Sequence, residues 1–135
     1  MTVAEDALTE GHITALVRRF YERALADASL RPIFEATIQD WEAHHRVVED
    51  FWSRMLLHTD RYRGSPYPVH ARLPIRPEHF DRWLALFREA ALETLPPRAA
   101  ERAIACSEHM AEAFKAGMFH GLETPIKPSL GYPVR

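Results

Sequence analysis

The sequence predicts an all-α protein, and three observations support this fold class. Apolar residues recur at spacings of three and four in several stretches of the 135-residue chain, which is the period of a buried helical face. No stretch shows the sustained alternation with β-branched residues that is typical of strands. Prolines and turn residues separate the helical stretches. A chain of this length is expected to form one domain with a single core.

The first helix is predicted to begin near Ile13 and to end before Asp27, with Ser29 and Pro32 marking its end. Its apolar stripe consists of Ile13, Leu16, Val17, Phe20, Tyr21 and Ala24. Residues 31–39, which carry Phe34 and Ile38, are expected to form a connecting segment.

Three more helices follow. One should begin after Asp40, a plausible N-cap with Glu42 in the first turn. Its stripe consists of Trp41, His44, Val48, Phe51, Trp52, Met55 and Leu56. Pro77 can open the next helix, whose inner face carries Phe80, Trp83, Leu84, Phe87 and Ala91. The pair Pro96-Pro97 should start the last long helix. We expect one domain over residues 1–120 and an irregular tail over 121–135.

The composition excludes several classes of protein. A net charge of −2 and a pI near 6.4 do not favour a nucleic-acid partner. The single cysteine, Cys106, rules out an intrachain disulfide and a cysteine-based zinc site. The amino terminus does not resemble a secretory signal, and no run of about 18 apolar residues predicts a membrane span. The cytoplasm is therefore the expected location.

His70 lies in an unusual setting. The stretch from 64 to 77, G-S-P-Y-P-V-H-A-R-L-P-I-R-P, places it among four prolines. Prolines fix their own φ and leave room for only about a turn of helix. Such a segment makes a poor core element, but it can hold one side chain in place. The alternative is a loop histidine with no role.

His44 is predicted to face the core, because it shares a stripe with Trp41, Val48 and Phe51. Its neighbour His45 is rotated by about 100° and should point elsewhere. The surface is the expected place for His45, His58, His79, His109 and His120. The alternative for His44 is a core histidine hydrogen-bonded to a backbone carbonyl.

No compact metal-ligand motif joins these histidines. Haem, however, needs only one protein ligand, because the porphyrin supplies four nitrogens. The predicted inner faces offer an apolar slot built from Phe20, Phe34, Trp41, Phe51, Trp52, Phe80, Trp83 and Phe87. The alternative is that these are ordinary core aromatics. The polar groups of Tyr21, His44 and Trp83 on the same faces favour haem, because buried donors need partners.

Several stretches, in this order, resemble the group III truncated haemoglobins. They are F-Y at 20–21 with L-R-P-I-F ending at Phe34, W-E-A-H at 41–44 with F-W at 51–52, Y-R-G-S-P-Y-P-V-H ending at His70, and H-F-D-R-W ending at Trp83. The resemblance covers roughly residues 13–119. It implies a truncated globin-like two-over-two helical sandwich around haem b.

The resemblance also implies roles for single residues. His70 would be the proximal iron ligand, and Tyr21, His44 and Trp83 would form the distal polar set, with His44 acting as a gate. Val48 would narrow the pocket. The full expected haem-binding set is Phe20, Tyr21, Phe34, Trp41, His44, Val48, Phe51, His70, Phe80 and Trp83. The guessed partners of the haem propionates are Arg54, Arg63 and Tyr67.

The expected function is reversible binding of O₂, and also of CO and NO, at ferrous iron. One alternative is enzyme-like: NO dioxygenation or peroxidase-type chemistry with an external reductase. A remote alternative is a helical interaction domain that binds no haem. The sequence does not choose between binder and enzyme.

Overall fold

The computed structural model describes residues 7–64 and 73–120. All regular structure in these residues is helical, which confirms the all-α prediction. The helices are α2 (Glu10–Leu25), α3 (Arg31–Thr37), α4 (Trp41–Leu57), α6 (Pro77–Thr94) and α7 (Pro97–Lys115), and one π-helical turn, η1 (Ala116–His120), continues from α7. No helix in the described ranges is long and apolar enough to cross a bilayer.

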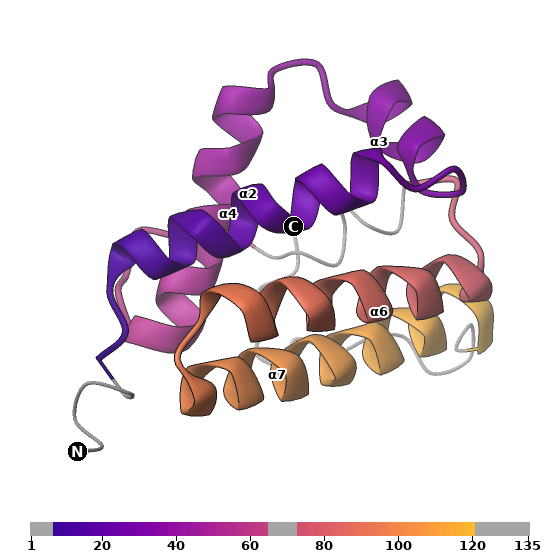
Figure 1. Ribbon diagram of the computed structural model, residues 1–135. Coiled ribbons are helices and arrows are strands. Elements are labelled where there is room, and N and C mark those ends of the chain that lie inside the picture. The colour runs from indigo at the N-terminus through magenta and orange to yellow at the C-terminus, as the bar shows by residue number, and fades with distance from the viewer. Residues whose placement is uncertain (1–6, 65–72, 121–135) are drawn as a thin grey trace.

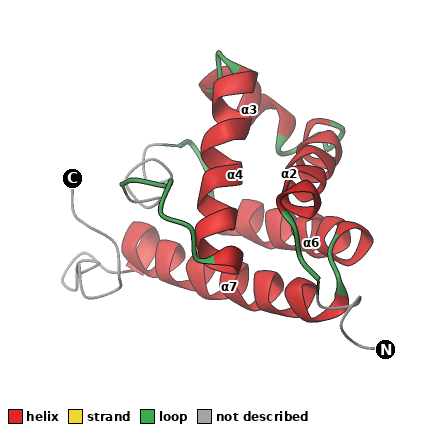
Figure 2. Cartoon of the chain, turned by 90° about the vertical axis from the view of Figure 1, so that its left-hand side faces the viewer, coloured by secondary structure: helices red, strands yellow, loops and turns green. Residues whose placement is uncertain are grey.

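The four long helices form two pairs. Helices α6 and α7, joined through Leu95 and Pro96, run side by side, and α2 lies beside α6 on the other side from α7 (Figure 1). Helix α4 packs against α2 and also contacts α7. The short helix α3 lies at the opposite end of the molecule from α7 (Figure 2). Side chains from α2, α3, α4, α6 and α7 together line one cavity.

The helices begin where the capping rules place them. Asp40 is the N-cap of α4, because its carboxylate accepts the N–H of Ala43 at 3.1 Å, as the sequence predicted. Pro77 and Pro97 open α6 and α7, where a missing N–H costs nothing. Helix α2 starts earlier than predicted, at Glu10, because Thr9 caps it.

Residues 31–39 are not a plain connection, and this prediction is wrong. Helix α3 forms there, with Pro32 in its first turn and Ile33 buried. The carboxylate of Asp27 accepts the N–H groups of Ser29 and Leu30, at 3.1 and 3.0 Å, and so shapes the turn before α3. Pro32 therefore opens α3 instead of marking the end of α2.

The core lies along the faces that the periodicity predicts. Every residue of the predicted α2 stripe is buried. Small residues allow α6 and α7 to approach closely, and these are Ala90, Ala91, Ala99, Ala100, Ala103 and Ala111. Two buried polar side chains, Ser53 and Ser107, are hydrogen-bonded.

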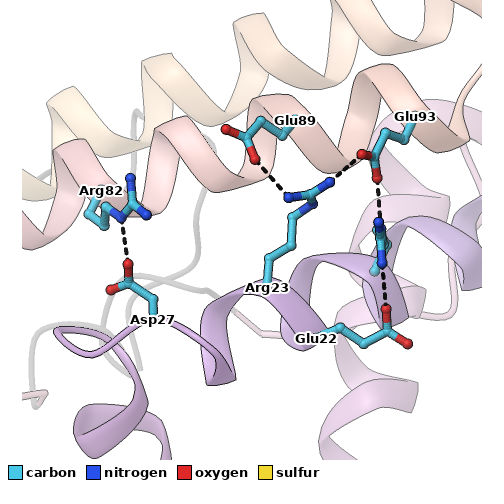
Figure 3. A network of polar contacts seen from close by, with 7 residues as sticks. Glu22, Arg23, Asp27, Arg82, Glu89 and Glu93 are labelled. Atoms are coloured by element: carbon cyan, nitrogen blue, oxygen red, sulfur yellow. Dashed lines mark hydrogen bonds and ion pairs between the residues drawn. The ribbon is translucent and has the colours of Figure 1, made fainter.

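Ion pairs join α2 to α6 along the outer edge of their contact (Figure 3). Arg23 bridges Glu89, at 2.9 Å, and Glu93, which also pairs with Arg19 at 2.7 Å. Arg82 makes a separate pair, at 2.5 Å, with Asp27 just after α2. Single exposed pairs contribute little, but a connected set restrains two helices more effectively. The network therefore helps to fix α2 relative to α6, the two helices that carry Tyr21 and Trp83.

Candidate functional site

A cavity of about 440 Å³ lies between the two helix pairs. It falls within the range of ~300–1,000 Å³ that is usual for sites of small molecules and cofactors. Most of its walls are apolar, formed by Leu16, Val17, Phe20, Leu30, Ile33, Phe34, Ile38, Val47, Val48, Phe51, Trp52, Leu73, Ile75, Phe80, Phe87, Met110 and Phe114. Its polar side chains include Tyr21, His44, Tyr62, His79 and Trp83.

Tyr21 and His44 form a hydrogen-bonded pair at the cavity wall. Tyr21 Oη lies 2.8 Å from His44 Nε2, and the tautomer of His44 decides which atom donates. Tyr21 is only 7% exposed, and burial raises the pKa of its hydroxyl. The hydroxyl therefore keeps its proton, and this proton is left for the cavity only where His44 Nε2–H donates to Tyr21 Oη.

Trp41 lies behind this pair and does not line the cavity. Its ring packs against the rings of Tyr21 and His44, with centroids 5.5 and 5.8 Å apart. Phe34 from α3 contacts the Tyr21 ring at 5.4 Å. These neighbours hold the tyrosine ring in one orientation, so Trp41 supports the site from outside.

His45 is not at the surface, and the prediction for this residue is wrong. Its ring lies 5.4 Å from that of Tyr21 and 5.6 Å from that of Trp41. Both ring nitrogens are buried, and neither has a hydrogen-bond partner among the described residues. Burial, followed by the nearby charge of Arg18, lowers the pKa of His45. Helix α4 therefore meets α2 with two successive positions, since His44 and His45 both contact the ring of Tyr21.

Trp83 comes from α6 and reaches the cavity from the other pair of helices. It stacks on Phe87, with centroids 5.8 Å apart and ring planes 19° apart, and it meets the edge of Phe20 at 6.0 Å. Phe20 in turn touches Tyr21 at 4.9 Å. The ring of Phe20 thus contacts the rings of both Tyr21 and Trp83, the two residues that carry hydrogen-bond donors.

Most of the residues expected from the sequence meet at this cavity. Those that line it are Phe20, Tyr21, Phe34, His44, Val48, Phe51, Phe80 and Trp83. His70 lies outside the described residues, so its role as iron ligand stays a prediction, and Tyr67 lies outside them as well. Arg54 and Arg63 are exposed and do not contribute to the lining.

Sequence reasoning missed His79. Predicted to be at the surface, it is half-buried and lines the cavity. Its Nδ1 accepts the backbone N–H of Arg76 at 2.9 Å. The signal was present in the sequence, because His79 stands at the third position of a helix that opens with Pro77, where a side chain can reach back to the N-cap. The other expected surface histidines with described side chains, His58 and His109, are exposed.

Cys106 has no place in this site. It is half-buried, and burial raises the pKa of its thiol to about 11. A thiol in such surroundings stays protonated and is a weak nucleophile.

The residues present suit a haem. Aromatic and aliphatic walls from both helix pairs can enclose the apolar porphyrin, and Tyr21, His44 and Trp83 provide polar groups beside it. In the described part of the chain, no three histidine, cysteine or acidic side chains gather to hold a bare metal ion.

Comparisons with known proteins point in the same direction. Residues 6–118 match the family model described as bacterial-like globin. The group 3 truncated haemoglobin of Campylobacter jejuni is 36% identical over 90 residues, which are 63% of this chain and 71% of that protein. The crystal structure of a group III truncated haemoglobin from Campylobacter jejuni superposes with a TM-score of 0.79 and 28% identity, over 84% of this chain and 94% of that one.

Proposed function

Because this chain belongs to the bacterial-like globin family, among the group III truncated haemoglobins, we propose that it binds haem b in the cavity and binds O₂ reversibly. The observation that carries this proposal is the Tyr21–His44 pair, 2.8 Å apart, at the wall of an apolar cavity of about 440 Å³. CO and NO are further ligands that such a site would accept.

Haem, when bound, would supply a ferrous iron with one coordination position open to a diatomic ligand. His70 is the proposed proximal ligand, on the strength of the motif that it shares with the family. Its neutral imidazole would bind through Nε2, with Nδ1–H held by a neighbouring acceptor. His79 cannot take this place while its Nδ1 accepts the N–H of Arg76, because its remaining proton then sits on Nε2.

Tyr21 and Trp83 would be the donors to the bound ligand. If His44 Nε2–H donates to Tyr21 Oη, the hydroxyl proton of Tyr21 is left for the cavity. In this tautomer His44 acts through Tyr21, by turning its proton toward the ligand. Trp83 would add its indole N–H from α6, on the far side of the Phe20 ring.

His44 would also control access. Val47 lines the cavity and is 53% exposed, so the cavity reaches solvent on α4 close to His44. Val48, next along the helix, narrows the space inside. A ligand that enters beside Val47 would therefore pass His44. The path would be closed while His44 is hydrogen-bonded to Tyr21 and would open when the His44 side chain moves.

An enzyme-like role is the second candidate, either NO dioxygenation or peroxidase-type chemistry with an external reductase. Two donors beside the ligand favour it, because they would slow ligand release and so suit turnover better than transport. Formation of nitrate from NO, under O₂ and with a supplied reductant, would distinguish this role from simple binding.

Absorption spectra test the haem proposal. The protein from haem-supplemented cells would be measured as ferric, as dithionite-reduced and as reduced with CO, for wild type, His70→Gly and His58→Gly. His58 is the matched control, because it is exposed and its φ of 64° already favours glycine.

The wild type and His58→Gly should share one strong Soret band that shifts with CO. His70→Gly should lose or alter this band, and added imidazole should restore it. A folded wild type that takes up no haem would overturn the proposal and leave a haem-free helical domain. An unchanged spectrum in His70→Gly would overturn only the ligand assignment.

A further inference from the structure

We propose that His79 binds a carboxylate of the cofactor, by donating its Nε2–H to one of the two propionate groups that haem b carries. The inference rests on the proposed function, since it assumes that haem occupies the cavity. It assigns a role to a residue outside the expected haem-binding set.

The backbone fixes the tautomer of His79. The N–H of Arg76 donates to His79 Nδ1 at 2.9 Å, so Nδ1 must carry a lone pair. The proton of the neutral ring is therefore on Nε2. His79 is thus a preset hydrogen-bond donor, and its ring orientation is held by the first turn of α6.

The position of His79 suits an anionic group. It lines the cavity beside Ile75 and Phe80 but is only half-buried, so it lies at the rim and not in the apolar interior. The carboxylates of haem would also lie at the rim, because burying an unpaired charge is costly. Arg54 and Arg63, the cationic partners suggested by the sequence, do not reach the lining.

Another histidine makes the same hydrogen bond at the start of its helix as His79 does. His12 stands at the same position in α2, and its Nδ1 accepts the backbone N–H of Thr9 at 3.0 Å. His12, however, does not line the cavity. The two histidines share the hydrogen bond from the backbone N–H of the N-cap residue, and Thr9 Oγ1 also lies 3.1 Å from His12 Nδ1. His12 therefore serves as a control for the loss of that cap away from the cavity.

The experiment measures the rate at which haem leaves the holoprotein for an excess of apomyoglobin. The variants are His79→Glu, His79→Gln and the control His12→Glu. Glutamate and glutamine both keep the cap, because their side-chain oxygens accept the N–H of the N-cap residue. Glutamate replaces the donor with an anion, whereas glutamine keeps a donor. Thermal unfolding of each variant checks that the fold is retained.

We expect His79→Glu to lose haem about tenfold faster than wild type, the size of a hydrogen bond to a charged group. His79→Gln should lie between these two rates, and His12→Glu should match wild type. The same proteins loaded with haem dimethyl ester, which has no free carboxylate, should lose it at equal rates.

Two results would overturn the inference while leaving the haem proposal intact. One is equal haem loss from His79→Glu and His12→Glu. The other is a difference between them that persists with the dimethyl ester, since the effect would then come from the helix start and not from the carboxylate. A wild type that retains no haem would instead remove the proposed function, and this inference with it.

Discussion

Tyr21 of α2 and His44 of α4 are joined across the interface of their helices by a hydrogen bond of 2.8 Å between Oη and Nε2. The tyrosine ring is enclosed by Phe34 and Trp41, with centroids 5.4 and 5.5 Å away. Its hydroxyl therefore has a restricted choice of partners. The same contact that helps to pack α2 against α4 also sets the polarity of the cavity wall.

A double-mutant cycle on this pair should reveal the contact in the free energy of unfolding. We expect Tyr21→Phe and His44→Leu each to destabilise the haem-free protein by about 1–3 kcal/mol, because each leaves a partly buried polar group without its partner. The double variant should cost about 1 kcal/mol less than the sum of the two. Urea unfolding, followed by circular dichroism, measures all four proteins.

His109→Leu serves as the control for the histidine substitution, because His109 is exposed on α7. Combined with Tyr21→Phe, it should give additive costs. Additive costs for the Tyr21 and His44 pair would mean that the 2.8 Å contact contributes no stability of its own.

Tyr21→Phe should also release O₂ faster from the haem-loaded protein. Loss of one hydrogen bond to a charged acceptor, here the bound O₂, corresponds to about 1.5–3 kcal/mol. The rate of O₂ dissociation should therefore rise roughly ten- to hundredfold. Stopped-flow mixing with CO measures this rate. CO dissociation from the same variant is the internal control, since CO is a weaker acceptor and should change much less. An unchanged O₂ rate would show that Tyr21 does not donate to the ligand.

The two buried serines should respond differently to alanine. Ser53 Oγ donates to Glu10 at 2.7 Å and lies 2.8 Å from Thr59 Oγ1, so it ties α4 to the start of α2. Ser107 donates only to Ile104 of its own helix. We expect Ser53→Ala to cost about 1–2 kcal/mol of unfolding free energy and Ser107→Ala to stay within about 0.5 kcal/mol. Urea midpoints would decide, and equal costs would contradict the role assigned to Ser53.

The long helices could be predicted because their signals are local. The apolar stripe from Ile13 to Ala24 correctly predicted the buried face of α2. The starts of α4, α6 and α7 were correctly predicted from Asp40, Pro77 and Pro97. Helix α3 was not predicted because it is short and contains Pro32, and proline is found both after helix ends and in first turns. The carboxylate of Asp27, which shapes the turn before it, acts through hydrogen bonds that periodicity does not reveal.

The placement of Tyr21 and His44 at the cavity could be predicted because each belongs to the apolar stripe of its helix. Burial could not be predicted for a residue whose exposure depends on how two helices pack against each other. His45 stands about 100° from His44 on the helix, yet the packing of α4 on α2 places it against Tyr21, and it also contacts Trp41 one turn earlier in α4. The position of His79 was not predicted for a related reason. Its ring is held by a hydrogen bond at the start of α6 and lines a cavity that is formed by several helices together.

The Asp27–Arg82 pair (Figure 3) should make stability depend on acid pH. Burial alone would raise the pKa of Asp27, but hydrogen bonds from Ser29, Arg82 and the Leu30 N–H outweigh it and lower the pKa from 3.8 to about 2. Because the folded value lies below the unfolded one, the stabilisation is present above pH ~4 and is lost as the pH falls through about 2. We expect about 1–2 kcal/mol near pH 7, reduced by solvent around the exposed Arg82.

Asp27→Asn should therefore be less stable than wild type at pH 7, and the difference should shrink between pH 4 and pH 2, where wild-type Asp27 also loses its charge. Urea unfolding of both proteins at a series of pH values gives this difference directly. Asp60→Asn is the control, because Asp60 is exposed in the loop after α4, and its effect should be small at every pH. A difference between Asp27→Asn and wild type that stays constant down to pH 2 would mean that Asp27 stabilises the turn before α3 by its shape, because an ionised carboxylate could not act equally at both ends of that range.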